Sequence, residues 1–227
     1  MNNPALPRAV IFDLDGVVVD TAHLHFIAWQ RLAQRIGIDI DMAFNEQLKG
    51  ISRRDSLAKI LAYGGMDNAF TADEREVMAE QKNREYVGLL NGLTTADILP
   101  GIRELLRTLR EQGVLTGLAS VSQNAGHVLS VLGLQADFDY VADTRHIMFS
   151  KPDPEIFLAV CDALKVLPSC AVGIEDAQAG IDALCAGGIF AIGIGSTLRG
   201  AQYRLDDTAG LTWAAITQQW KRHQAGN

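Results

Sequence analysis

Short apolar runs that alternate with helical patterns constrain the fold of this chain more than any other feature. The runs begin at Ala9 and continue at residues 115–119, 140–142, 171–174 and 190–194, with helical patterns near 102–109, 128–132, 156–160 and 177–186. Strands that alternate with helices pair in parallel through right-handed crossovers. The pattern therefore predicts an α/β fold with a doubly wound parallel sheet.

A second, all-helical unit is expected between the first two strands. From Asp20 to about Leu93 the patterns are helical, and two helices begin with capping boxes at Ser52 and Thr71. We therefore expect a core domain of residues 1–18 and 94–227 and a helical cap domain of residues 19–93. After residue 201 we expect two helical pieces, the second beginning at Thr212.

Charge and cysteine content exclude several function classes. The formal net charge is −7, so we expect no nucleic acid or anionic membrane partner. Cys161, Cys170 and Cys185 lack a CxxC spacing, which favours reduced thiols over a zinc site or disulfides. No signal peptide pattern and no apolar run of about 18 residues is found. We expect a cytoplasmic monomer that acts on a small molecule.

The first strand delivers two carboxylates, Asp13 and Asp15, just before Gly16. Side chains alternate along a strand, so both carboxylates lie on the same side. Two carboxylates at the end of a buried strand repel each other and lose hydration unless a divalent cation compensates. The alternative is a surface turn in which the D-x-D-G sequence only ends the strand.

Polar residues also follow the other predicted strands. They are Ser120 and Ser122, Lys151, and Glu175 with Asp176. Ligands bind beyond the carboxyl ends of strands in an open parallel sheet, so these groups are expected to converge. Carboxylates hold Mg²⁺, while a hydroxyl and a lysine stabilise phosphoryl oxygens. The set therefore favours Mg²⁺-dependent phosphate chemistry.

Four segments resemble the four motifs of the haloacid dehalogenase superfamily in order and spacing. They are FDLDG at 12–16, SVS at 120–122, SKPDPEIF at 150–157 and GIEDAQAGI at 173–181. The resemblance implies that the helical insert is a mobile cap. It also implies that Asp13 is a nucleophile that forms an aspartyl phosphate, and that Asp15 is the general acid and base.

The same resemblance implies roles for the other motif residues. Asp13, the Asp15 carbonyl and Asp176 would ligate Mg²⁺, with Glu175 as a further or outer ligand. Ser120 and Lys151 would hold the transferring phosphoryl group. The bond between Lys151 and Pro152 is expected to be cis.

The insert resembles the β-phosphoglucomutases within that superfamily, through FNEQLKGISRRDS at 44–56, HFIAW at 25–29 and KNREYV at 82–87. This implies interconversion of β-glucose 1-phosphate and glucose 6-phosphate through a β-glucose 1,6-bisphosphate intermediate. Arg53 would hold the second, distal phosphate. The other implied substrate-binding residues are His25, Trp29, Leu48, Gly50, Ile51, Ser52, Lys82, Val121, Ser122 and Asn124. The chain departs from the mutases at Gln123, where they carry a lysine.

Two other functions fit parts of the pattern. A sugar-phosphate phosphatase needs only the core motifs, with water as the acceptor. A phospho-signalling receiver also accepts phosphate on an aspartate, but such a module is a single domain of about 120 residues. The helical insert has no purpose in a receiver, so the mutase is the function we predict.

Overall fold

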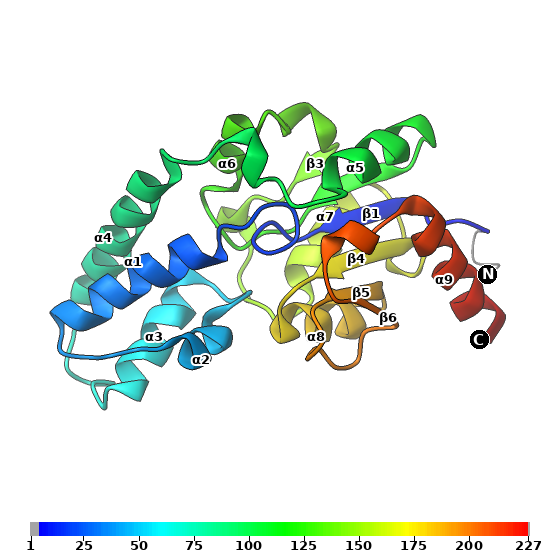
Figure 1. Cartoon of the computed structure of the whole chain (residues 1–227). Helices are drawn as coiled ribbons and strands as arrows, with labels where there is room; N and C mark the ends of the chain where they lie inside the picture. The colour runs from blue at the N-terminus through cyan, green and yellow to red at the C-terminus, as the bar shows by residue number, and fades with distance from the viewer. Residues whose placement is uncertain (1–4, 227) are drawn as a thin grey trace.

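The computed structural model describes residues 5–226 and contains a sheet of six parallel strands in the order β3-β2-β1-β4-β5-β6 (Figure 1). The strands are β1 (Ala9–Phe12), β2 (Leu115–Leu118), β3 (Tyr140–Val141), β4 (Ala171–Glu175), β5 (Phe190–Ile194) and β6 (Tyr203–Leu205). The chain builds the sheet outward from β1 to β3 and then crosses to β4 on the other side of β1. The predicted doubly wound parallel sheet is confirmed.

Helices cover both faces of the sheet, and β1 shows why. Val10 and Phe12 point into one apolar cluster, while Ala9 and Ile11 point into another. Successive side chains of a strand point to opposite faces, so a strand that is apolar at every position must be covered on both sides. The first cluster includes α5 (Ile102–Glu111), α6 (Ala125–Leu132) and α9 (Trp213–Gly226), and the second includes α7 (Glu155–Ala163) and α8 (Gln178–Ala186).

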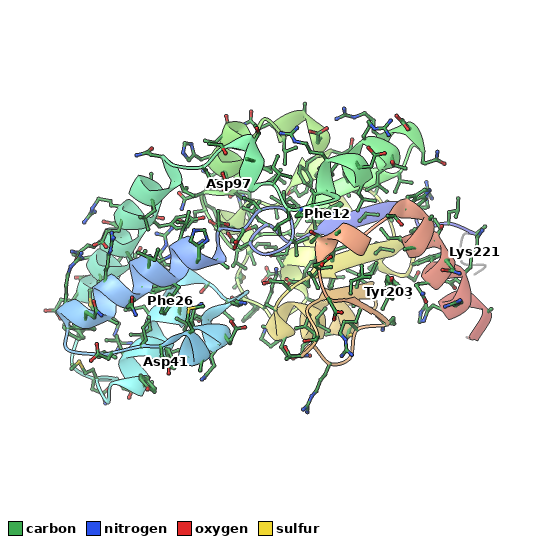
Figure 2. The ribbon with its side chains drawn as sticks, viewed as in Figure 1. Phe12, Phe26, Asp41, Asp97, Tyr203 and Lys221 are labelled. Atoms are coloured by element: carbon green, nitrogen blue, oxygen red, sulfur yellow. The ribbon has the colours of Figure 1, made fainter. Side chains whose placement is uncertain are left out.

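Four helices form a bundle at one end of the sheet, on the side away from α9 (Figure 1). They are α1 (Ala22–Arg35), α2 (Met42–Asn45), α3 (Arg53–Tyr63) and α4 (Ala72–Leu90). The bundle has its own apolar cluster around Trp29 and Ile60, against which Phe26 packs. Figure 2 shows Phe26 and Asp41 in the bundle. Residues 20–93, all described here, contain no strand, as predicted. Within residues 5–226, no helix has the length and apolar character needed to cross a bilayer.

Two connecting segments join the bundle to the sheet, and they lie side by side. Val19 and Ile98 form an antiparallel bridge. The N–H of Leu99 donates to the carbonyl of Val18 over 3.0 Å. The chain therefore leaves and re-enters the sheet domain through one paired segment.

The prediction for the tail was wrong in its first half. Tyr203–Leu205 is the edge strand β6, which pairs in parallel with β5, rather than a helical piece. Tyr203 (Figure 2) and Leu205 pack against the first apolar cluster, while Arg204 between them is exposed. A three-residue strand is too short for its alternation to stand out in a sequence. The second piece is a helix, α9, which follows Thr212 as predicted.

Glycine at position 173 is required for α8 to pack on β4. A Cβ there would overlap the side chain of Leu184, which is fully buried. We expect Gly173→Ala to lower the free energy of unfolding by about 1–3 kcal/mol, because overpacking displaces neighbours. Urea denaturation measures this change.

Gly126 on α6 is the matched control, because a Cβ there meets nothing within 4 Å. Gly126→Ala should leave stability unchanged or raise it by up to about 1 kcal/mol. Equal stability changes in the two variants would contradict the packing argument.

Candidate active site

Three carboxylates meet at the carboxyl ends of β1 and β4. Asp13 directly follows β1, Glu175 ends β4, and Asp176 comes next. One oxygen from each lies within 4.8 Å of the others. Asp13 and Glu175 are buried, and such a set of hard oxygen ligands fits a divalent cation.

Two glycines make room for these carboxylates. Gly16 has a left-handed φ of +81°, and a Cβ there would overlap the carboxylate of Asp176. A Cβ at Gly180 on α8 would overlap the carboxylate of Glu175. The glycines of the first and fourth motifs therefore allow the acidic groups to approach the backbone.

The cluster is electrostatically costly without a cation. Burial raises the pKa of Glu175 to about 7. Burial, followed by the charges of Glu175 and Asp13, raises the pKa of Asp176 well above its usual value. Lys49 of the bundle lies 3.8 Å from Asp176, too far for a strong ion pair. The donor set and its excess negative charge fit a bound cation.

Lys151 neutralises part of this charge from inside the protein. Its Nζ donates to Asp13 Oδ1 over 2.6 Å, to Glu175 Oε1 over 2.5 Å and to the carbonyl of Ala119 over 3.0 Å. Burial alone lowers the pKa of Lys151, but Asp13 and Glu175 outweigh it and the net pKa is raised. Lys151 therefore stays charged. Its bond to Pro152 is cis, as the resemblance implied.

The residues after β2 form the next wall. Ser120 is buried, and its hydroxyl accepts a hydrogen bond of 3.1 Å from the N–H of Ser122. This bond fixes the turn that presents Val121 and Ser122 to the cavity. Ser120 itself lies behind that surface, beside Ala119, whose carbonyl Lys151 contacts.

Asp15 lies between the sheet and the bundle. Its carboxylate accepts a hydrogen bond from the hydroxyl of Thr21 and lies 3.7 Å from His25 Nε2. Burial raises the pKa of Asp15 to about 6, and the negative charge of Asp13 adds to the effect. A carboxyl group with this pKa exchanges protons readily near neutral pH, as a general acid and base must.

His25 and Lys82 form a contact inside the bundle. Lys82 Nζ lies 2.7 Å from His25 Nδ1 and packs over the rings of Trp29 and Tyr86 at 4.7 and 4.9 Å. Burial and then the charge of Arg53 lower the pKa of Lys82 to about 7. Burial, with Lys82 adding to it, lowers the pKa of His25 well below its usual value. The pair thus offers hydrogen-bond donors, and near neutral pH Lys82 carries only part of its usual positive charge.

These groups surround one cavity of about 560 Å³. The predicted residues in its wall are Asp13, Asp15, His25, Trp29, Leu48, Gly50, Ile51, Ser52, Arg53, Lys82, Val121, Ser122, Asn124 and Asp176. Ser120, Lys151 and Glu175 lie behind this wall and are buried. Trp29 and Leu48 also pack within the bundle cluster.

The bundle and the sheet domain contact each other across the cavity. Arg53 donates to Gln123 Oε1 over 3.0 Å, and the amide of Asn124 donates to Asn83 Oδ1 over 2.8 Å. Gln123 thus accepts from the guanidinium, which a lysine cannot do.

Sequence reasoning did not assign several wall residues, among them Lys49, Asn83, Thr144, Arg145, Ile147, Met148, Phe149 and Ser150. Asn83 adjoins Lys82 in a quoted motif, so that signal was present. The segment 144–149 carries no motif. Its exposed residues, which include Met148 and Phe149, do not distinguish it in sequence from a loop without function.

A family model described as haloacid dehalogenase-like hydrolase matches residues 7–188, which include every strand-end group above. The chain belongs to this family. The predicted superfamily resemblance is confirmed, with the carboxylates, Lys151 and Ser120 at the expected strand ends.

Relatives within the haloacid dehalogenase-like family include both mutases and phosphatases. The chain is 42% identical to a β-phosphoglucomutase of Bacillus subtilis, over 96% of this chain and 97% of that protein. It superposes on a crystal structure of β-phosphoglucomutase from Clostridium difficile with a TM-score of 0.95 and 44% identity, covering 97% of this chain and 100% of that one. It is 31% identical to a phosphorylated carbohydrates phosphatase of Thermotoga maritima, over 80% and 82% of the two chains.

A divalent cation should stabilise this family member in a pH-dependent way. The pKa of Glu175 rises from 4.5 to about 7 on folding, so ionisation over this range costs stability as the pH rises. Mg²⁺ binds the ionised carboxylates and removes that cost, so MgCl₂ should raise Tm more at pH 8 than at pH 5.5. At 100 times its Kd, a ligand stabilises by about 2.7 kcal/mol.

Differential scanning fluorimetry of metal-stripped protein measures both shifts. Asp176→Asn removes one ligand and should abolish most of the response. An equal Tm shift at both pH values, or in both proteins, would contradict a carboxylate-bound cation.

Proposed function

We propose that this protein is a β-phosphoglucomutase, which interconverts β-D-glucose 1-phosphate and D-glucose 6-phosphate through β-glucose 1,6-bisphosphate. The observation that carries the proposal is that one cavity holds both a phosphoryl-transfer site and Arg53. The bundle supplies Arg53, while the sheet supplies Asp13 and Asp15. A phosphatase needs only the residues of the sheet domain and has no use for Arg53. The B. subtilis and C. difficile relatives support the same activity.

We further propose that residues 19–93 form a cap domain that moves against the sheet domain. The bundle's own apolar cluster supports this division. So does the polar character of the contacts across the cavity, such as Arg53 with Gln123. Polar contacts exchange with water at little cost, which allows the cap to open for substrate.

The proposed cofactor is Mg²⁺, held by Asp13, Asp176 and the Asp15 carbonyl, with Glu175 as a further or outer ligand. When bound, the cation would neutralise phosphoryl oxygens and polarise the phosphorus for attack. The raised pKa values of Glu175 and Asp176 support a site built for positive charge.

In the proposed reaction Asp13 is the nucleophile. Its carboxylate oxygen attacks phosphorus, and the bond from phosphorus to the sugar oxygen breaks. Protonated Asp15 donates its proton to that leaving oxygen. In the second half-reaction, Asp15 takes a proton from the acceptor hydroxyl, and this oxygen then receives the phosphoryl group from Asp13. Lys151 and Ser120 hold the phosphoryl oxygens.

Arg53 would bind the phosphate that is not being transferred. A guanidinium fork can make two parallel bonds to one phosphate. One of its nitrogens donates to Gln123 Oε1, an uncharged partner that a phosphate can displace. Because His25 is neutral and Lys82 is only partly charged near neutral pH, they would attract this phosphate less than Arg53 does and would bind sugar hydroxyls.

The protein as proposed is a cytoplasmic monomer. The three cysteines are free thiols, which supports a reducing compartment.

Asp15→Asn tests the proposed general acid and base. The variant should still bind substrate, while kcat falls by about 10²–10⁴-fold because the amide cannot transfer a proton. Steady-state kinetics with β-glucose 1-phosphate and a bisphosphate primer measure this loss. Turnover close to wild type would assign the proton transfer to another group.

The proposed function itself is tested by a coupled assay that follows glucose 6-phosphate and free phosphate together. A mutase forms glucose 6-phosphate without releasing phosphate, whereas stoichiometric release indicates a phosphatase. Arg53→Ala should reduce mutase flux by at least tenfold and leave acetyl phosphate hydrolysis nearly unchanged, because a charged hydrogen-bond partner of the distal phosphate is lost.

Arg84→Ala is the matched control for that variant. Arg84 is also a bundle arginine, but its side chain is 68% exposed and pairs with Glu80. Both activities should be retained. Equal losses of mutase flux and hydrolysis in the Arg53 variant would show that Arg53 acts on folding or on the transfer step.

A further inference from the structure

Three segments of the chain begin with the same kind of cap, a Ser or Thr followed three residues later by Asp or Glu. In two of them the acidic side chain accepts the backbone N–H of the capping residue. Thr71 donates to Glu74 over 2.7 Å, and Thr94 donates to Asp97 over 2.7 Å. This bond completes a capping box and satisfies a backbone donor locally.

The third cap, at the start of α3, differs in that one bond. Asp55 accepts from the hydroxyl of Ser52 over 2.6 Å, and its N–H donates back over 3.2 Å. The N–H of Ser52 instead crosses to the sheet domain and donates to Ser150 Oγ over 2.7 Å. The cap of α3 is therefore shared between the bundle and the core.

Both residues of this shared bond adjoin functional residues. Ser52 directly precedes Arg53, and Ser150 directly precedes Lys151. The preceding turn sits tightly on the core, because a Cβ at Gly50 would lie 3.1 Å from Ala177 Cβ and 3.8 Å from Lys151 Cδ. The bond from Ser52 to Ser150 thus connects the helix that carries Arg53 to the loop that carries Lys151.

The Ser52 donor is more rigid than the other groups that bridge the cavity. Arg53, Gln123, Asn83 and Asn124 meet through flexible side chains. The Ser52 N–H belongs to the backbone at a helix start, so its direction is fixed by α3 itself. A bond to it defines where the first turn of α3 lies relative to the core.

We propose that Ser150 is a positioning residue that fixes α3, and with it Arg53, over the cavity when the bundle lies against the core. Asp55 is the alternative acceptor: when the bundle moves away, its carboxylate takes the Ser52 N–H and completes the capping box. The donor is paired in both positions, so exchange between them avoids the cost of an unpaired backbone group. This inference rests on the proposed mutase function for its kinetic effect.

The kinetic test compares Ser150→Ala with Ser150→Thr. The alanine variant should lower kcat/KM for β-glucose 1-phosphate by about 2- to 10-fold, the effect of one lost neutral hydrogen bond. Acetyl phosphate hydrolysis should stay within about twofold, because Lys151 keeps its partners. Threonine retains the hydroxyl acceptor and should restore mutase activity. Equal losses in both reactions, no loss in either, or failure of threonine to rescue would overturn the proposal.

Small-angle X-ray scattering of the ligand-free proteins tests the exchange of acceptors without any assay of turnover. Ser150→Ala should increase the radius of gyration, because the closed position loses its acceptor. Asp55→Ala should leave the radius of gyration unchanged or lower it, because the open position loses its acceptor for the Ser52 N–H. An increase of the radius of gyration in both variants would contradict the proposed exchange of the Ser52 N–H between Ser150 and Asp55.

The scattering comparison also separates this inference from the proposed function. Wild-type protein that releases phosphate but makes no glucose 6-phosphate would overturn the mutase and leave the scattering result to decide the role of Ser150.

Discussion

The buried ion pairs between Lys151, Asp13 and Glu175 are the interaction on which the site depends. Lys151 lies in the segment after β3, Asp13 directly follows β1 and Glu175 ends β4, so they meet only if the strands pair in the observed order. Burial of such charges is costly. Removal of one partner would destabilise the protein by about 3–5 kcal/mol, because it leaves a buried charge unpaired. One ammonium faces three carboxylates once Asp176 is included, which leaves the net negative charge that a divalent cation would balance.

The helical bundle adjusts the chemistry of that site by excluding water from it. Burial raises the pKa of Asp15 to about 6 and lowers that of Lys82 to about 7, although one is an acid and the other a base. Both shifts reduce the charge of a buried side chain, Asp15 between the sheet and the bundle and Lys82 within the bundle. Closure of the bundle over the sheet would therefore set proton affinities as well as hold substrate. In the proposed mechanism, the motion of the bundle would thereby be linked to the general acid and base role of Asp15.

The sequence could predict those parts of the structure whose signals are local. The apolar runs located the strands, and the topology of a parallel sheet then placed Asp13, Lys151 and Asp176 at one edge. Strand β6 was missed because three residues carry too little periodicity. The cap at Ser52 was predicted as a local box, yet its N–H binds Ser150, which lies 98 residues away in the chain. Ser150 competes with the local acceptor Asp55 for this N–H, and the motif around Ser52 contains no signal that predicts it. The same holds for Met148 and Phe149, whose place in the cavity wall depends on the whole fold.

The paired connecting segments have a mechanical consequence. Val18 and Leu99 are hydrogen-bonded, and Val19 bridges Ile98, so the bundle is attached through a short two-stranded ribbon rather than two independent threads. The two connections are therefore held to each other at these residues. If the bundle moves as proposed, its two connections would move together. Each closure would then return α3 to the same position over the cavity.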